Sequence, residues 1–230
     1  MVVNLALLAL TLVLYGLFRW LQGQLRSPLL NPVLLAIACL VPLLLWLDIP
    51  YSRYRQATWL INTFLEPAVV ALAYPLYQQL GLIRAQWRAL LTTCSIGVIL
   101  AMGLTLLLAT LLGADQQVLM SLAPKAVTTP IAMGVSEKLG GIPALTAVLV
   151  ILAGIAGAML GPAILDRLQV TSAQARGLAM GCAAHAVGTA RMVDESPQAG
   201  AFAGLALTLC GIITATIAPI VVPLLLEWIR

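Results

Sequence analysis

Two short motifs place positive charge and hydroxyl groups at breaks in an otherwise apolar pattern. They read PKAVTTP at residues 124–130 and HAVGTAR at residues 185–191. The cationic or titratable groups are Lys125, His185 and Arg191. Beside them stand three hydroxyl donors, Thr128, Thr129 and Thr189. All of these groups donate hydrogen bonds to the oxygens of an anion, so the chemistry they indicate is binding of a small carboxylate without bond formation.

The composition shows what surrounds these motifs. Of the 230 residues, 62% are hydrophobic and 9% are charged, whereas soluble domains carry roughly 25% charged residues. So few charges cannot cover a soluble globule, and we expect lipid around most of the chain. Continuous apolar runs such as 144–165 do not alternate as the strands of a membrane barrel do. The sequence therefore predicts an all-α integral membrane protein.

Long segments without charge mark the expected transmembrane helices. A helix needs about 20 mostly apolar residues to cross the hydrocarbon, and about six segments qualify. They cover residues 4–21, 29–47, 58–79, 89–112, 142–165 and 200–226. Basic residues flank these segments instead of forming a stripe, which argues against nucleic-acid binding. We predict a single membrane domain, 1–230, with N-terminal helices in 1–112 and a core in 113–230.

Two further stretches, 117–138 and 172–196, contain the motifs and resemble neither loops nor simple crossings. Each has short apolar arms around a helix break, at 124–130 and at 185–191. Ten helical residues reach about 15 Å, which is half of the hydrocarbon. Each stretch is therefore either re-entrant or a broken helix that crosses, and the positive-inside rule favours re-entry with the N-terminus outside. Re-entrant stretches would come from opposite faces, and their tips would meet.

The two stretches also form a weak internal repeat. KAVTT at 125–129 aligns with HAVGT at 185–189, and a long apolar helix follows each motif. Transporters often contain such repeats, with their substrate site at broken helices near the midplane. Non-helical backbone at that depth must line protein or a water-filled cavity, and helix N-termini there attract anions. The expected site is therefore at the two breaks.

Each candidate side chain also has a structural interpretation that the sequence leaves open. Lys125 could lie at the membrane interface with its ammonium in water. His185 could be a hydrogen-bonded packing residue, and Arg191 could end a segment on the cytoplasmic side. Threonine hydroxyls often bond back to a carbonyl of their own helix. The recurrence of these residue types at matching places favours the binding interpretation.

Glu66 is a separate candidate, because it lies in an otherwise apolar segment. A carboxylate within a membrane is a candidate proton or sodium site, so Glu66 could couple transport to an ion. The alternative is an interfacial position, since Glu66 lies near the start of its expected helix.

We predict no enzyme activity, because the sequence has no phosphate-binding loop, nucleophile elbow or metal-ligand cluster. The chain has one histidine, so we expect no metal site and no cofactor. Its four cysteines lie in hydrophobic segments without a CxxC pair. We interpret them as small packing residues.

Three strings, at 67–77, 124–132 and 177–191, resemble the LrgB/CidB family. The resemblance includes SPLLNP at 27–32 and covers nearly the whole chain. It implies binding roles for the residues that match the two family motifs: Lys125, Thr128 and Thr129 in the first, and His185, Gly188, Thr189 and Arg191 in the second. Glu66 departs from the family pattern, in which neutral residues are usual, and this weakens its proposed role in ion coupling.

The resemblance implies a multi-pass protein of the bacterial inner membrane that transports small monocarboxylates of the pyruvate, lactate, glycolate or glycerate type. Other members are described as antiholin-like regulators of murein hydrolase release and cell lysis, so a holin- or antiholin-like role is the alternative. Family members are usually encoded beside a smaller LrgA/CidA-type membrane protein. We therefore expect such a partner and a homo- or hetero-oligomer.

Overall fold

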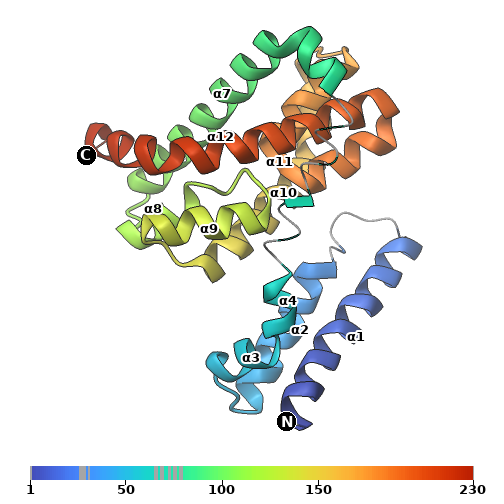
Figure 1. Cartoon of the computed structure of the whole chain (residues 1–230), viewed down its shortest axis with the longest axis vertical. Helices are drawn as coiled ribbons and strands as arrows, with labels where there is room; N and C mark the ends of the chain where they lie inside the picture. The colour runs from blue at the N-terminus through green and yellow to red at the C-terminus, as the bar shows by residue number, and fades with distance from the viewer. Residues whose placement is uncertain are drawn as a thin grey trace. The chain divides into compact units, whose positions relative to one another are not determined.

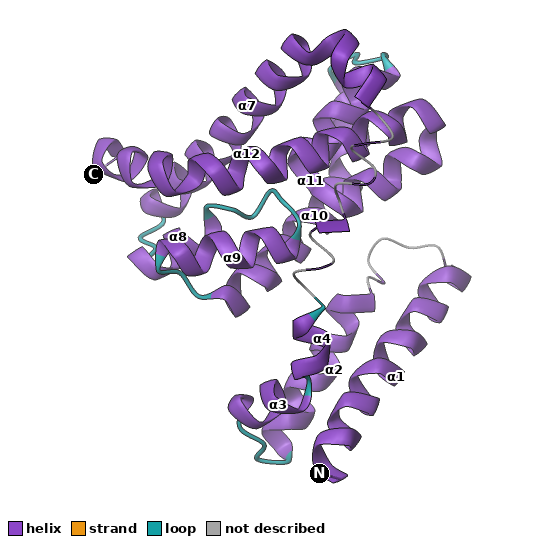
Figure 2. Ribbon diagram, in the orientation of Figure 1, coloured by secondary structure: helices purple, strands orange, loops and turns teal. Residues whose placement is uncertain are grey.

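The computed structural model describes residues 2–25, 30, 32–64, 67, 70, 71, 74, 77 and 80–229. All regular structure in these residues is helical (Figure 2). Four helices of the described chain are long and apolar enough to cross a membrane: Val3–Leu25, Ile83–Leu111, Pro143–Arg167 and Pro197–Trp228. The predicted class, an all-α membrane protein, is confirmed.

The chain divides into two compact units, Met1–Val70 and Ala71–Arg230. The first unit contains α1 (Val2–Leu25), α2 (Pro32–Trp46), α3 (Tyr51–Ala57) and α4 (Trp59–Thr63) (Figure 1). Within it, α1 packs against α2 and α3. The hydroxyls of Thr11 and Tyr54 lie 3.0 Å apart, which joins α1 to α3.

The second unit contains the predicted core. Its helices are α7 (Leu80–Leu111), α8 (Gln116–Leu122), α9 (Thr129–Leu139), α10 (Pro143–Arg167), α11 (Ala173–Glu195) and α12 (Pro197–Ile229). α12 packs against α7, α9 and α11, and α10 packs against α8, α9 and α11. α7 therefore belongs with the core helices, although the sequence analysis grouped it with the N-terminal ones.

The long helices match the predicted crossings and extend beyond them. α1, α7, α10 and α12 cover the segments predicted at 4–21, 89–112, 142–165 and 200–226 almost completely. The helices continue past the charged residues at which the apolar segments end. A long charged side chain on a helix can still extend to water, so it does not stop the helix. α2 is a shorter apolar helix within the segment predicted at 29–47. The segment predicted at 58–79 lies largely outside the described residues, and so does Glu66.

α11 is a helical hairpin and not a straight rod. Arg176 near its start binds Glu195 at its end, with Nε 2.5 Å from Oε1 and Nη2 3.0 Å from Oε2. The two residues are 19 apart in the sequence, and a straight helix would separate them by about 28 Å. The chain reverses at His185, where φ is 40° and ψ is −130°. We call residues 173–195 hairpin 2, with an inbound arm before His185 and a return arm after it.

Glycines allow the arms of hairpin 2 to pack closely. A Cβ on Gly188 would lie 2.7 Å from the carbonyl oxygen of Met180, a contact that requires the return arm to lie against the inbound arm. A Cβ on Gly157 of α10 would lie 2.5 Å from the Cβ of Ala184. Small residues are therefore needed where the two arms of hairpin 2 pack against each other and where the hairpin packs against α10.

α8 and α9 form a second reversal, hairpin 1, around the non-helical residues 123–128. Thr146 Oγ1 in α10 lies 2.7 Å from Ser136 Oγ in α9 and donates to the carbonyl of Ser121 in α8 at 3.0 Å. Both arms therefore meet beside the first turn of α10. A neutral network of hydroxyl groups holds the base of this hairpin.

The two hairpins start from opposite ends of α10. This helix has 25 residues, which is a length of about 37 Å. Hairpin 1 meets it at Thr146 in the first turn, whereas the Arg176 of hairpin 2 binds Asp166 in its last turn, Nη1 to Oδ1, at 2.6 Å. Both stretches reverse direction, as the predicted re-entrant pair requires, and neither continues in one direction as a broken crossing helix would.

Both helix breaks are narrower than predicted. α9 begins at Thr129, so the first break covers 123–128 instead of 124–130. The second break, predicted over 185–191, is confined to His185, and the residues after it are helical. Gly188 does not end the helix, and its lack of a side chain allows the close approach to Met180. Each hairpin is followed by a long helix, α10 or α12, in the manner of an inverted repeat.

Candidate anion site at the hairpin tips

His185 forms the tip of hairpin 2, and its ring is fixed to α10. Nε2 lies 2.8 Å from the carbonyl oxygen of Val150. A carbonyl only accepts, so Nε2 carries the proton and Nδ1 keeps its lone pair. The ring has room because residue 154 is glycine, where a Cβ would lie 2.6 Å from the Cε1 of His185.

The backbone of His185 is strained. Its positive φ with a strongly negative ψ is a conformation that side chains other than glycine rarely adopt, at a cost of about 1–3 kcal/mol. The bond to Val150 and the close fit against Gly154 hold it in place. Strain of this kind persists where the surrounding structure fixes it, and it is concentrated at binding and catalytic sites.

Lys125 and Thr128 form the tip of hairpin 1. Lys125 is half-buried, and within the described part of the chain no carboxylate pairs with its ammonium. Thr128 Oγ1 is buried and has no hydrogen-bond partner among the described residues. An unpaired buried hydroxyl costs about 1–3 kcal/mol. A bound oxygen ligand would satisfy both groups.

The return arms of both hairpins begin at these tips. α9 begins at Thr129, and the return arm of hairpin 2 follows His185. The first N–H groups of a helix lack intrahelical partners and form the positive end of its dipole. Both hairpins pack against the same helix, α10. An ammonium and a hydroxyl at the first tip, and a helix N-terminus at each tip, are groups that suit a small anion.

The remaining predicted residues divide between the tips and the arms. Thr129 is the first residue of α9 and is half-buried. The hydroxyl of Thr189 donates to the carbonyl of His185 at 2.8 Å. This is the bond to its own helix that the sequence offered as the alternative to binding. Gly188 has a packing role, and Arg191 is exposed on the return arm, about 9 Å along the helix from the turn. Of the predicted cations, Lys125 and His185 therefore lie at the two turns, whereas Arg191 lies along the return arm.

One cluster was missed by the sequence analysis. Cys94 of α7, Cys182 of hairpin 2 and Cys210 of α12 have their sulfur atoms within 4.8 Å of one another. Their separations in the sequence, 88 and 28 residues, concealed this cluster. Only knowledge that α7 and α12 both pack against hairpin 2 could have indicated this cluster.

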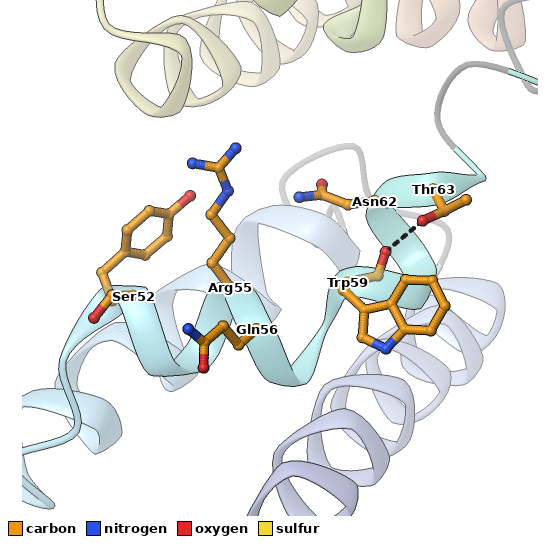
Figure 3. A pocket seen from close by; sticks show the side chains of 7 residues that line it. Ser52, Arg55, Gln56, Trp59, Asn62 and Thr63 are labelled. Atoms are coloured by element: carbon orange, nitrogen blue, oxygen red, sulfur yellow. Dashed lines mark hydrogen bonds between the residues drawn. The ribbon is translucent and has the colours of Figure 1, made fainter.

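A separate open hollow of about 630 Å³ lies on the first unit (Figure 3). It is lined by Tyr51, Ser52, Arg55, Gln56, Trp59, Asn62 and Thr63. Arg55 and Asn62 point to one side of α3 and α4, whereas Gln56 and the Trp59 ring point to the other. The polar groups that line this hollow therefore do not converge on one point.

Comparison with known protein families assigns the chain to a family. The model of the LrgB-like family matches residues 11–224. The chain belongs to the LrgB-like family. This membership confirms the resemblance stated from the motifs and, together with the apolar helices, makes the chain a multi-pass membrane protein of that family.

Relatives of similar length occur in several bacteria. The chain is 41% identical to an uncharacterized protein of Haemophilus influenzae over 93% of this chain and 94% of the relative. It is 32% identical to the holin-like protein CidB of Staphylococcus epidermidis, with 94% of each chain covered. It is also 32% identical to the holin-like protein CidB of Staphylococcus aureus (strain Mu50), with 95% of each chain covered. No solved structure matches the chain. The names of these relatives favour the holin-like alternative over transport.

Proposed function

We propose that this chain is a carrier for small monocarboxylates of the pyruvate, lactate, glycolate or glycerate type in the bacterial inner membrane. The observation that carries the proposal is the buried, unpartnered hydroxyl of Thr128 beside the half-buried Lys125. Burying a cation and a hydroxyl without partners is unfavourable, and a bound carboxylate removes both costs.

The carboxylate would occupy the space between the hairpin tips. One of its oxygens would accept from Thr128 Oγ1 and from the first N–H groups of α9, and the ammonium of Lys125 would balance its charge. His185 would supply Nδ1 as an acceptor, because its Nε2 is bonded to Val150. An acceptor beside an anion site suits the hydroxyl group of a 2-hydroxy acid.

The opposed hairpins suggest how access would alternate. Hairpin 1 starts at the first turn of α10 and hairpin 2 at its last turn. Movement of one hairpin relative to its base would therefore open the site to one side of the membrane only. Carriers with inverted repeats work by such alternating access around a fixed central site.

Transport by purified protein in proteoliposomes tests this proposal. We expect saturable uptake of labelled pyruvate or glycolate, and we expect Lys125→Ala and Thr128→Val to reduce it at least tenfold. The matched control is Lys138→Ala, which removes an exposed lysine from the last turn of α9. Uptake by Lys125→Ala equal to that of the control would refute the site.

A holin- or antiholin-like role is the second candidate, because the CidB relatives bear that name. A protein of this kind would form or regulate a lesion through which murein hydrolases act. Liposomes would then release trapped dyes in an order set by dye size, without saturation. Size-graded leakage in the absence of saturable uptake would favour this function over the carrier.

A smaller LrgA/CidA-type membrane protein is the partner that the proposal includes, within a homo- or hetero-oligomer. The described helices expose many large apolar side chains, which can contact either lipid or a second membrane protein. Reconstitution with and without the neighbouring gene product distinguishes these cases. Uptake that appears only on co-reconstitution would make the chain one subunit of the carrier.

A further inference from the structure

The thiols of Cys94 in α7, Cys182 in hairpin 2 and Cys210 in α12 lie close together, and Cys182 is three residues before the turn at His185. The Sγ of Cys182 lies 4.0 Å from that of Cys94 and 3.2 Å from that of Cys210. All three sulfur atoms are within 4.8 Å of one another, and no fourth histidine, cysteine or carboxylate joins them among the described residues. The structure therefore contains a preformed triangle of soft ligand atoms.

The spacing of this triangle fits a central metal ion. Metal–sulfur bonds are about 2.3 Å long, and three such bonds in a plane place the sulfur atoms about 4.0 Å apart. The separation of Cys94 and Cys182, 4.0 Å, equals this value, and that of Cys182 and Cys210, 3.2 Å, is shorter. Small rotations of the side chains would complete the site without moving the helices.

The surroundings determine which ion fits. Cys94 and Cys210 are almost fully buried, at 0% and 1% exposure. Thiolate ligands suit both Cu(I) and zinc, but structural zinc prefers four ligands and the described residues supply three.

A route to the sulfur atoms is present. A cavity of about 400 Å³ lies between α7 and α11, and Cys182 is part of its wall. Most of its other lining residues have small side chains or none: Thr93, Gly97, Ala101, Ala175, Leu178, Ala179 and Ala183. The half-buried Cys182 is therefore the thiol that an incoming ion meets first.

We propose that Cys94, Cys182 and Cys210 form a three-coordinate site for a soft monovalent cation of the Cu(I) class. The site does not depend on the proposed carrier function, because none of the three cysteines belongs to the candidate anion site. A bound ion connects the inbound arm of hairpin 2 to α7 and α12. It therefore stabilises the hairpin against movement.

Competition for Cu(I) against a chromophoric chelator tests the proposal on the reduced full-length protein in nanodiscs. We expect one Cu(I) per chain, three sulfur ligands by X-ray absorption, and a Tm raised by about 5 °C at Cu(I) well above its Kd. Cys182→Ser should lose the ion and the Tm shift. The matched control is Cys39→Ser, because Cys39 is an exposed thiol on α2 that lies outside the cluster.

Several results would overturn the proposal. These are Cu(I) binding unchanged in Cys182→Ser, binding lost in Cys39→Ser, Zn²⁺ bound more tightly than Cu(I), or fewer than three sulfur ligands. If the serine variants do not fold, the X-ray absorption measurement on the unmodified chain still decides the coordination number. Saturable carboxylate uptake with no Cu(I) binding would refute this site and leave the carrier intact.

Discussion

The two hairpins reverse direction by different means. Hairpin 1 turns through residues 123–128, which include Pro124, and neutral hydroxyl groups hold its base. Hairpin 2 turns at His185, and the ion pairs of Arg176 hold its base. A proline breaks a helix by itself, whereas a histidine with positive φ needs its neighbours to hold it. Hairpin 2 should therefore be the more sensitive of the two to substitutions in its surroundings.

The largest effect is expected when the charged base of hairpin 2 is broken. Arg176→Met leaves the partly buried Glu195 without its partner, and we expect a loss of about 2–3 kcal/mol of unfolding free energy. Unfolding in mixed micelles with increasing denaturant measures this loss. Asp166→Asn is the matched comparison, because that carboxylate is 67% exposed and should contribute little. Equal losses in the two variants would contradict a buried Arg176–Glu195 pair.

A second substitution tests the support of the strained turn. Gly154→Ala places a Cβ 2.6 Å from the His185 ring, and the forced displacement should cost about 1–3 kcal/mol. Gly103→Ala in α7 is the control, since its Cβ would meet nothing within 4 Å and alanine favours a helix. The unfolding midpoint should therefore fall in the first variant and stay or rise in the second. A stabilised Gly154→Ala protein would show that the ring is not held there.

The smallest effect is expected at the base of hairpin 1. Thr146→Val removes the hydroxyl that joins Ser121 and Ser136, at a cost of about 1–2 kcal/mol. This loss should not change with salt, because the network is neutral and fully buried. The loss in Arg176→Met should shrink as salt rises, since Glu195 is partly exposed and its pairing is screened. The same salt dependence in both variants would contradict the difference between the two bases.

The sequence predicted one hairpin better than the other, for a physical reason. Pro124 and Pro130 mark the first break directly, because proline removes a donor and clashes with the preceding turn. Nothing in the string around His185 requires a reversal, so the predicted break at 185–191 was too long. The reversal depends on a carbonyl of Val150 and on the space at Gly154, both of which belong to another helix.

The candidate site, like the hairpins, could be predicted only in part. Lys125 and Thr128 could be proposed because a cation and hydroxyl groups at a proline-marked break are unusual in an apolar chain. The roles of Gly188 and Thr189 in packing and local hydrogen bonding required the folded-back arm. The cysteine cluster required three helices to be placed side by side, which a pattern along one chain cannot show.

A distance between the two ends of α11 tests the central claim, that α11 folds back on itself at His185. Spin labels on genetically encoded keto amino acids at positions 174 and 194 leave the four native cysteines intact. Pulsed electron resonance in nanodiscs should give a separation below about 20 Å, because Arg176 and Glu195 are in contact. A separation near 30 Å, the length of about 20 residues of straight helix, would contradict the account.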